Sequence, residues 1–439
     1  MRSTAAELAE VLGGQLTGPD VEVSGLTIDS RAVAPGQLFA AVRGGRDGHD
    51  FAGAALDAGA AAVLVERPVP ELDGRDRPAT AIVVPDVQKA LAGLARWARS
   101  RMPDRVVGVT GSVGKTTTKD LLAAVLSRRF VTAASEKSFN NELGVPLTLA
   151  NVPDGVEAVV VEMGSRGAGH VDVLCEMARP TIGVVTTVQG VHTEVMGGLE
   201  QIAEAKAELV AALPPEGIAV LNADVDLVAR MAERTEARVV TFGEGGEVRV
   251  EEVRVDEELR AAFRLRSPWG GADVRLAVRG VHNVGNALAA AAVGLAVGLD
   301  PEEVASGLAE STTSPWRMDL RRARSGALVL NDAYNAGPAS MAAALEALRS
   351  LPAERYVAVL GLMAELGDSA QEEHRRIAAL AEELGVELVA VGTDLYGVEP
   401  LASVDEAAES LGWIGEGVAV LVKGSRVAGL EVLAERLLG

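Results

Sequence analysis

The chain has 439 residues, 48% hydrophobic and 23% charged, which is enough apolar material for packed cores and excludes a disordered chain. At roughly 150 residues per domain, this length predicts about three domains. The net charge of −21 disfavours nucleic-acid binding, because an acidic surface repels phosphate backbones. The single cysteine, Cys175, excludes an internal disulfide. No signal sequence or run of about 18 apolar residues is found, so we expect a cytoplasmic protein without membrane insertion.

Residues 1–84 are expected to form a small mixed α/β domain. The expected elements are a helix within 4–14, strand-like residues 21–31, a helix within 51–60, and strands at 61–66 and 80–85. A helix from about 86 to 101, marked by the apolar residues Leu91, Leu94 and Ala95, leads into the next unit.

Residues 85–313 are expected to form a central, doubly wound, mostly parallel sheet of the P-loop ATPase kind. The expected strands are Val106–Thr110, Ala158–Glu162, Ile182–Thr186, Ile218–Asn222 and Val239–Phe242. They are almost wholly apolar, as parallel strands covered on both faces are. Alternating residues between 248 and 278 predict an antiparallel excursion, and a helix over 283–297 closes the unit.

Residues 314–439 repeat the alternation of strands and helices. The expected strands lie at 327–332, 356–361, 388–392 and 418–424, with helices between them. This rhythm predicts a C-terminal Rossmann-like α/β domain.

The sharpest motif is GVTGSVGKTTTKD, from Gly108 to Asp120, which follows an apolar strand and opens a helix. Backbone N–H groups at such a helix start can hold phosphate oxygens. Lys115 would reach the terminal phosphates, and the Thr116 hydroxyl would bind Mg²⁺. The general P-loop spacing is not met, because Val109 stands where its first glycine belongs. The alternative is a glycine-rich turn without a ligand.

Three further residues could serve a cation. Glu162 ends a strand, where it could hold a second cation or simply face solvent. Lys206 falls on the apolar stripe of its helix, formed by Leu199, Ile202, Leu209, Val210 and Leu213. Snorkelling outward is the commoner outcome for such a lysine, whereas burial would lower its pKa and allow a carbamate that ligates a hard cation. His192 is either a loop histidine or a metal neighbour.

Other candidates lie near helix starts and strand ends. Asn286 could pair with adenine, whereas Asn283 is expected to cap the helix. Asp332 and Asn335 flank a strand end and are candidates to hold ribose or phosphate, as is the preceding Arg317. The motif LVKGSR, residues 421–426, suits a carboxylate or phosphate, or is a surface turn.

Together these motifs resemble the Mur ligase family along the whole chain. The stretch IDSRAVAPGQLFAAVRGGRDGHDF resembles its uridine-nucleotide-binding domain, and TGSVGKTT and AKAE resemble its ATPase centre. The stretches FNNELGVP, NDAYNAGP and LVKGSR favour the member that adds D-alanyl-D-alanine to a UDP-N-acetylmuramoyl-tripeptide. The resemblance implies an ATP-dependent amide ligase, acting through an acyl phosphate in peptidoglycan synthesis. We expect it to act as a monomer.

The resemblance also implies roles for individual residues. ATP would lie on the loop residues Thr110, Gly111, Ser112, Gly114, Lys115, Thr116 and Thr117, with Asn286 on adenine and Arg317, Asp332 and Asn335 on ribose and phosphate. The resemblance implies two Mg²⁺ sites. Thr116 would contribute to one, and Glu162, His192 and a carbamylated Lys206 would form the other. For Lys206, the resemblance therefore favours a carbamate over a side chain that snorkels to the surface. Lys115, His192 and Lys206 would be the catalytic set. Ser30 and Arg31 would face the uridine nucleotide, Asn140 and Asn141 the muramyl peptide, and Lys423, Ser425 and Arg426 further substrate groups.

Three positions depart from the family pattern. Leu362 stands in GLMAELG where the family often has an acid, Val281 replaces a cation in GVHN, and Trp316 replaces glycine in the commoner PGR. The first two put in doubt contacts of those side chains to nucleotide or dipeptide. The alternatives are a third-residue-adding or folylpolyglutamate-like ligase, a non-ligase partner subunit, or a non-catalytic nucleotide-binding module.

Overall fold

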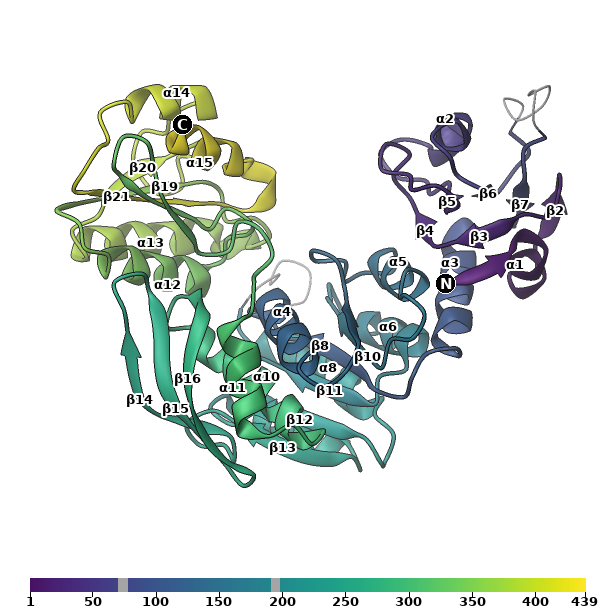
Figure 1. The fold of residues 1–439 in the computed structure, drawn as a ribbon. Helices are drawn as coiled ribbons and strands as arrows, with labels where there is room; N and C mark the ends of the chain where they lie inside the picture. Colours follow the sequence, from purple (N-terminus) through teal and green to yellow (C-terminus); the bar gives the residue numbers. More distant parts are fainter. Residues whose placement is uncertain (70–77, 191–197) are drawn as a thin grey trace.

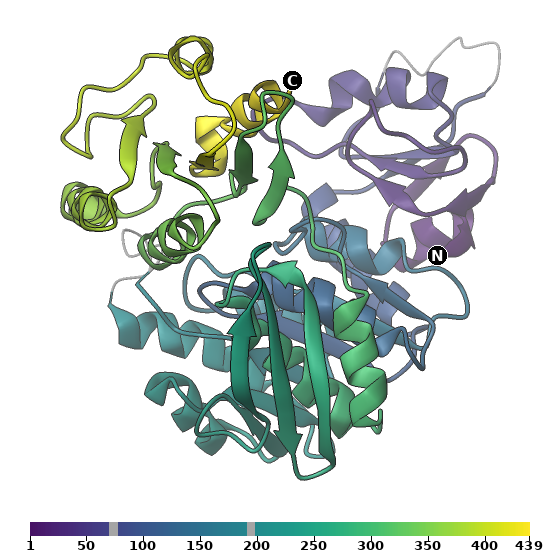
Figure 2. The same cartoon turned by 60° about the vertical axis from the view of Figure 1, so that its left-hand side comes forward.

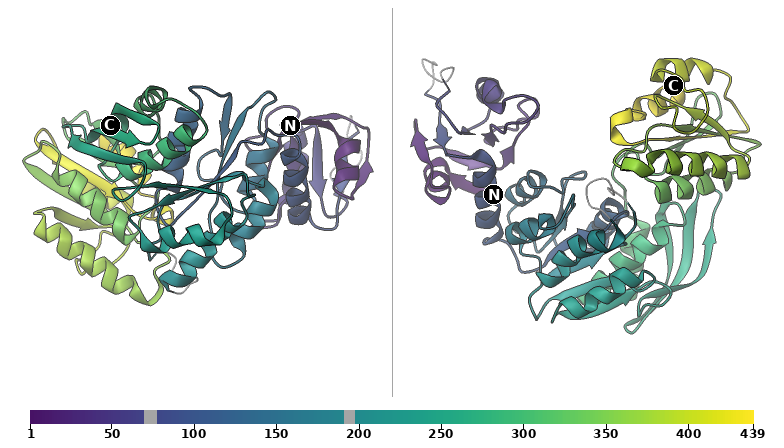
Figure 3. Two further views of the ribbon diagram at one scale, coloured as in Figure 1. Left: turned by 90° about the horizontal axis from the view of Figure 1, so that it is seen from below. Right: turned by 180° about the vertical axis from the view of Figure 1, so that it is seen from behind.

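In the computed structural model, residues 1–69, 78–190 and 198–439 are described. Their elements form three lobes: an N-terminal lobe from β1 to β7, a central lobe from β8 to α11, and a C-terminal lobe from β17 to α15. The N- and C-terminal lobes project from opposite ends of the central lobe (Figure 1), and the view from behind shows the same arrangement (Figure 3). No helix in the described ranges is long and apolar enough to span a membrane.

The N-terminal lobe contains a mixed sheet in the order β2-β7-β6-β5-β4, in which only the β2–β7 pair is antiparallel, beside an antiparallel β1–β3 pair. Its strands are β1 (Arg2–Thr4), β2 (Gln15–Thr17), β3 (Glu22–Ser24), β4 (Leu26–Thr27), β5 (Leu38–Ala40), β6 (Ala62–Val65) and β7 (Ala81–Val83). Its helices are α1 (Ala5–Val11), which Thr4 caps, η1 (Gly48–Phe51) and α2 (Ala52–Asp57). Helix α3 (Val87–Arg99), which Asp86 caps, leads to the central lobe, as expected.

The central lobe is built on a parallel sheet in the order β13-β12-β11-β8-β10-β9. Its strands are β8 (Val106–Thr110), β9 (Thr132–Ala134), β10 (Ala158–Glu162), β11 (Ile182–Val185), β12 (Ile218–Asn222) and β13 (Arg238–Phe242). Its helices are α4 (Lys115–Leu126), α5 (Gly144–Ala150), α6 (His170–Ala178), α8 (Leu199–Ala211), α9 (Asp226–Ala229), η3 (Arg230–Arg234), α10 (Asn283–Ala296) and α11 (Pro301–Ala309). The apolar strands predicted this sheet correctly, and only the short β9 was not expected.

Both faces of this sheet are covered, which explains why its strands are apolar throughout. Val107 and Val109 of β8 pack with α4 and α10, whereas Val106 of the same strand packs with α5 and α6 on the other face. The expected antiparallel excursion is the sheet β14 (Arg249–Val255), β15 (Arg260–Ser267) and β16 (Gly270–Arg279). These strands stand beside α10 and α11 in Figure 2.

The C-terminal lobe has the sheet order β17-β18-β21-β19-β20, parallel except for the β17–β18 pair. Its strands are β17 (Asp319–Arg322), β18 (Leu328–Asn331), β19 (Arg355–Leu360), β20 (Glu387–Ala390) and β21 (Val418–Lys423). Its helices are α12 (Pro338–Arg349), η4 (Gly367–Ser369), α13 (Ala370–Glu383), α14 (Val404–Ser410), η5 (Arg426–Ala428) and α15 (Glu431–Leu438). The strand β17 was not expected.

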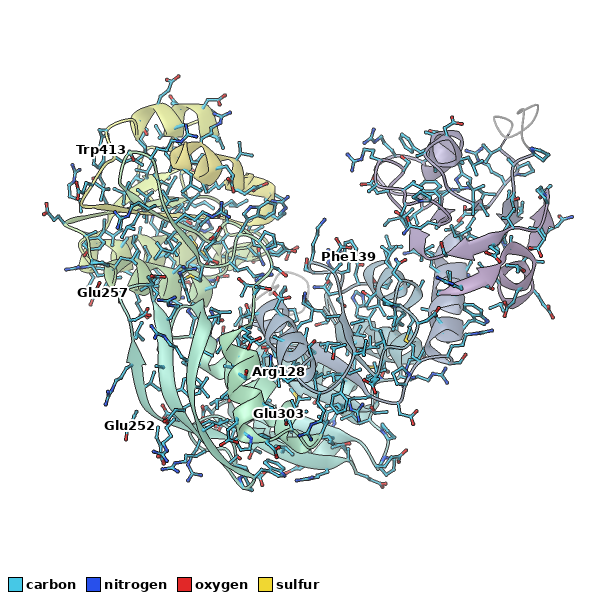
Figure 4. All side chains as sticks on the ribbon, in the orientation of Figure 1. Arg128, Phe139, Glu252, Glu257, Glu303 and Trp413 are labelled. Atoms are coloured by element: carbon cyan, nitrogen blue, oxygen red, sulfur yellow. The ribbon has the colours of Figure 1, made fainter. Side chains whose placement is uncertain are left out.

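Direct contacts hold both outer lobes to the central lobe. The side chain of Asn151 accepts from the N–H of Leu26 and donates to its carbonyl, at 2.9 and 2.8 Å, which joins the N-terminal sheet to the end of α5. At the other end, the buried Leu259 of the β14–β15 turn packs into the core of the C-terminal lobe. The neighbouring Glu257, labelled in Figure 4, marks this turn beneath that lobe. The parallel sheets of the central and C-terminal lobes have their carboxyl ends at one pocket.

Candidate active site

The phosphate-loop motif forms the turn between β8 and α4. Gly111 has φ +147° and Gly114 has φ +83°, so both adopt backbone conformations that favour glycine. A Cβ on Gly111 would lie 1.9 Å from Oγ1 of Thr186, and one on Gly114 would lie 2.2 Å from Oδ1 of Asn286. The backbone therefore approaches its neighbours so closely that only glycine fits at either position. The first residues of α4, Lys115, Thr116 and Thr117, line the pocket, and backbone N–H groups at a helix start can hold an anion.

Lys115, the first residue of α4, folds back over this loop. Its Nζ donates to the carbonyls of Gly111 at 2.6 Å and Ser112 at 3.0 Å. Burial lowers the pKa of Lys115, and the nearby Arg317 adds to this, while the negative charge of Glu162 opposes it. The ammonium group is thus close enough to a carboxylate and to a second cation to be influenced by the charge of both.

Glu162 occupies the carboxyl end of β10 and is 1% exposed. Its Oε1 accepts from Nδ2 of Asn140 at 2.8 Å. Its Oε2 is also buried and has no hydrogen-bond partner among the described residues. A buried carboxylate oxygen without a partner is costly, and a cation would satisfy it. Glu162 therefore fits the role of a Mg²⁺ ligand.

Lys206 lies on α8 and is 2% exposed, so its side chain does not snorkel to the surface. Its Nζ donates to Oγ of Ser165 at 3.3 Å. Burial, and then the positive charge of Lys115, lower the pKa of Lys206 to about 7. The expected apolar stripe of α8 is correct for Lys206, which is buried. It is wrong for Leu199, the first residue of the helix, which is 45% exposed. His192 lies outside the described residues.

A second group of side chains reaches the phosphate loop from the C-terminal lobe. Nη2 of Arg317 donates to Oγ1 of Thr116 at 2.8 Å, and its guanidinium lies 4.2 Å from the ring centre of Tyr334. The hydroxyl of Tyr334 is hydrogen-bonded to that of Ser138 in the central lobe. Arg317 therefore contacts the loop itself, on the hydroxyl expected to hold Mg²⁺.

Asp332 follows β18 and is paired with Lys423 at the end of β21. Lys423 is 2% exposed and also donates to the carbonyl of Asn335 at 3.1 Å. The other carboxylate oxygen of Asp332 accepts from the N–H of Met318 at 3.1 Å. This ion pair thus ties two strand ends to the segment that carries Arg317.

Ser425 and Arg426 follow Lys423. Oγ of Ser425 accepts from the N–H of Ala364 at 2.9 Å, which fixes the loop after β19. Arg426 is about half exposed, with Nη1 2.6 Å from Oε1 of Glu431. Ser425 thus has a structural partner, whereas the Arg426 side chain is paired with Glu431 and still about half exposed.

The two asparagines at the start of α10 differ from expectation. Asn283 does not cap this helix: His282 is the N-cap, and Asn283 lies inside the first turn, where its Nδ2 donates to the carbonyl of Arg279 at 2.6 Å. Nδ2 of Asn286 donates to Oδ1 of Asn283 at 2.7 Å, while Oδ1 of Asn286 accepts from Thr118 at 3.2 Å. Asn286 is therefore held against the phosphate loop.

One pocket of about 780 Å³ collects most of the expected residues. Those that line it are Gly111, Ser112, Gly114, Lys115, Thr116, Thr117, Asn140, Asn141, Glu162, Lys206, Asn286, Arg317, Asp332, Asn335, Lys423, Ser425 and Arg426. Thr110 is fully buried beneath the loop, with a hydroxyl that has no partner within the described ranges. Ser30 and Arg31 lie apart in the N-terminal lobe, where Arg31 pairs with Asp29 at 2.8 Å. Asn141 accepts from the N–H of Gly144 at 2.8 Å and so steadies the start of α5.

Several pocket residues were not predicted from the sequence: Ser138, Ser165, Arg166, Thr186, Gln189 and Tyr334. Tyr334 belongs to the same NDAYNAGP motif as Asp332 and could have been identified there. The others follow strand ends without a distinctive pattern. Among the described residues, no cluster of three or more His, Cys, Asp or Glu side chains could hold a metal alone. Mg²⁺ commonly uses one or two protein carboxylates together with waters and substrate phosphates, which matches this site.

Comparisons with known proteins agree with these features. Residues 22–99 match the catalytic domain of the Mur ligase family, residues 109–294 the Mur ligase middle domain, and residues 316–426 the Mur ligase glutamate ligase domain. A Mycobacterium bovis protein named UDP-N-acetylmuramoyl-tripeptide–D-alanyl-D-alanine ligase is 42% identical over 89% of this chain and 83% of its own length. A crystal structure of MurF from Acinetobacter baumannii superposes with a TM-score of 0.87 at 31% identity, over 100% of this chain and 99% of that one. A MurF ligase from Thermotoga maritima in complex with ADP gives a TM-score of 0.81 at 28% identity, over 94% and 97% of the two chains.

Proposed function

The chain belongs to the Mur ligase family, and from this premise we propose that it joins D-alanyl-D-alanine to UDP-N-acetylmuramoyl-tripeptide at the expense of ATP. This reaction completes the peptidoglycan precursor pentapeptide. The observation that carries the proposal is the single pocket in which the phosphate loop, the unpartnered Glu162 oxygen and the buried Lys206 meet cations of the C-terminal lobe. The name of the relative with 42% identity supports the choice of this substrate pair.

The proposed reaction has two steps. The terminal carboxylate of the peptide attacks the γ-phosphate of ATP, which releases ADP and leaves an acyl phosphate. The amine of D-alanyl-D-alanine then attacks that carbonyl carbon, and phosphate leaves as the amide bond forms. Two anions must approach each other in the first step, so positive charge and positioning are what the protein has to supply. Lys115 and Arg317, which both contact the phosphate-loop motif, provide two such charges.

Bound Mg²⁺ would neutralise phosphate charge in this site. We propose that Thr116 contributes to one metal site, and that Glu162, His192 and a carbamylated Lys206 form the other. A neutral amine is needed to add CO₂, and the pKa of about 7 means that a substantial fraction of Lys206 is neutral near pH 7. Asn140 orients the Glu162 carboxylate by donating a hydrogen bond to Oε1, while Oε2 has no partner among the described residues.

The remaining proposed contacts follow the family pattern. We propose that Asn286 reads adenine, that Arg317, Asp332 and Asn335 hold ribose and phosphate, and that Ser30 and Arg31 contact the uridine nucleotide. Asn140 and Asn141 would face the muramyl peptide, and Lys423, Ser425 and Arg426 the remaining substrate groups. We further propose a cytoplasmic monomer divided into residues 1–84, 85–313 and 314–439.

The deciding experiment measures phosphate release from ATP with UDP-N-acetylmuramoyl-tripeptide, with and without D-alanyl-D-alanine, using tripeptides that end in lysine or in diaminopimelate. We expect release that requires both substrates. Release with the UDP-dipeptide and a free third amino acid instead would assign the chain to third-residue addition. Turnover only with a folate and glutamate would indicate a folylpolyglutamate-like ligase, and an absence of any amine-dependent release would leave a nucleotide-binding protein.

A further inference from the structure

The segment that enters the C-terminal lobe has an unusual backbone at Trp316. Trp316 has φ +61° and Met318 has φ +51°, so a left-handed residue stands on each side of Arg317. Such a conformation is unfavourable for a bulky side chain, whereas glycine adopts it freely. Strained residues of this kind persist where surrounding contacts hold them, and they gather at functional sites. Because glycine would adopt this conformation without strain, we expect the Trp316 side chain to make a contact that glycine could not make and that offsets the strain.

That contact is with Arg426. The Arg426 guanidinium lies 4.5 Å from the centre of the Trp316 ring, within the range of a cation–π interaction. Nη1 of the same guanidinium is 2.6 Å from Oε1 of Glu431, whose side chain is 16% exposed. An aromatic ring and a carboxylate thus hold the guanidinium of Arg426, whose side chain remains about half exposed and lines the pocket.

Of the described cations that line the pocket from the C-terminal lobe, Arg426 has the exposed side chain, whereas Arg317 is half-buried and Lys423 is buried. Lys115 bonds loop carbonyls, Arg317 bonds Thr116, and Lys423 is paired with Asp332. Beyond its contact with Glu431, the Arg426 guanidinium makes no hydrogen bond to another described residue. Arg166, the other open arginine of the pocket, follows β10 on the side of Glu162. Arg426 is therefore the C-terminal cation most open to a substrate in the pocket, whereas the unpartnered Nε of Arg317 is buried.

We propose that Trp316 is a positioning residue that holds Arg426 ready to bind the terminal carboxylate of the incoming dipeptide. A fixed guanidinium suits a carboxylate because its paired N–H groups match the two oxygens, and pre-organisation reduces the entropy lost on binding. The inference rests on the proposed function and names the group that selects a dipeptide acid as the amine substrate.

The test compares D-alanyl-D-alanine with its C-terminal amide, which lacks the carboxylate, in the wild type and in Trp316→Leu, Trp316→Phe and Arg426→Gln. Leucine keeps a Cβ at the strained position but removes the aromatic ring, and phenylalanine keeps a ring. We expect Trp316→Leu to raise KM for the acid about three- to tenfold, with kcat and KM for ATP changed less than about twofold. We expect the amide to show no such difference, and Trp316→Phe to behave nearly as wild type.

Arg426→Gln should raise KM for the acid more strongly, and Trp316→Leu should add nothing to it, because the ring acts through Arg426. The matched control is Trp413→Leu. Trp413 stacks 4.0 Å from Arg355, which also pairs with a carboxylate, Glu387, but it lies on the outer side of the C-terminal lobe (Figure 4). This control should leave both KM values unchanged.

Three results would overturn the proposal. They are equal use of acid and amide by the wild type, an equal loss with both substrates in Trp316→Leu, and additive effects of the two substitutions. Failure of the proposed function is a separate outcome, because the wild type would then not join the dipeptide at all. A thermal melt of each variant verifies folding, and Trp316→Gly, which relieves the left-handed strain, should melt no lower than wild type yet still show the raised KM.

Discussion

Arg317 of the C-terminal lobe donates to the Thr116 hydroxyl of the phosphate loop at 2.8 Å, across 201 positions of sequence. The bond joins the beginning of α4 to the segment that enters the C-terminal sheet. The Thr116 hydroxyl that accepts this hydrogen bond is the group expected to bind Mg²⁺. On the metal assignment that we propose for Thr116, Arg317 would leave this hydroxyl and turn toward the phosphates when metal and nucleotide bind.

Arg317→Ala should lower the rate of ATP-dependent phosphate release at least about 100-fold, because the transition state loses a directed positive charge. Stability should change little, since the side chain spans two lobes at an open pocket. Initial-rate assays at saturating substrate measure the effect. Arg321→Ala, at an exposed arginine of β17 paired with Asp319 at 2.8 Å, is the matched control and should keep normal rates. A mutant at position 317 with more than a third of wild-type activity would contradict the assignment.

Lys206→Ala should be inactive, with turnover reduced at least about 100-fold, and should recover in part with added formate or acetate. A short carboxylate can occupy the space of the side chain and replace the oxygen ligand that a carbamate supplies. Removal of CO₂ should slow the wild type and have no effect on the rescued variant. The control is Glu204→Gln on the exposed face of the same helix, which pairs with Arg234. Full activity of Lys206→Ala would rule out a carbamate.

Asp332→Ala should lower the free energy of unfolding by about 3 kcal/mol, because Lys423 keeps its charge in a buried position without its carboxylate. Chemical denaturation measures this loss. The double variant Asp332→Leu, Lys423→Met should regain at least half of it, since no buried charge is then left alone. Glu387→Ala removes the exposed carboxylate that pairs with Arg355, and it should lower the free energy of unfolding by less than about 1 kcal/mol. Equal costs for the exposed and the buried pair would show that the interpretation is wrong.

His374 should make the protein less stable at mildly acid pH. It is fully buried on α13, its Nε2 accepts from the N–H of Met363 at 2.9 Å, and its Nδ1 donates to the carbonyl of Ala370 at 2.6 Å. Burial lowers the pKa of His374. The unfolded chain takes up a proton near pH 6.5, and the native state does so only at lower pH. Stability is therefore full above about pH 6.5 and falls as the pH drops toward the native pKa, by at most about 1.4 kcal/mol per pH unit.

Denaturation between pH 5 and 7.5 should show that His374→Gln has a shallower pH dependence than the wild type. His170→Gln, at a histidine of α6 whose side chain is 43% exposed, is the control and should retain the wild-type slope. Identical slopes for the wild type and His374→Gln would contradict the prediction.

The sequence by itself determined the local features of this protein. Apolar runs gave both parallel sheets because a strand covered on two faces needs apolar residues at every position. The glycine spacing around Lys115 located the phosphate loop, and helical periodicity placed Lys206 on the apolar stripe of α8 without deciding whether its side chain is buried. These features depend on residues a few positions apart, so their pattern is legible in the chain. The short edge strands β9 and β17 were missed because few of their residues are buried.

Tertiary structure alone decided which distant residues meet. The pairs that meet are separated by about 90 to 200 residues in the chain. They are Arg317 with Thr116, Tyr334 with Ser138, Lys423 with Asp332, and Arg426 with Trp316. Their contacts depend on strand order and on the way two sheets place their carboxyl ends at one pocket, which no local periodicity encodes. The same holds for the open oxygen of Glu162, because its lack of a partner is a property of the packed surroundings.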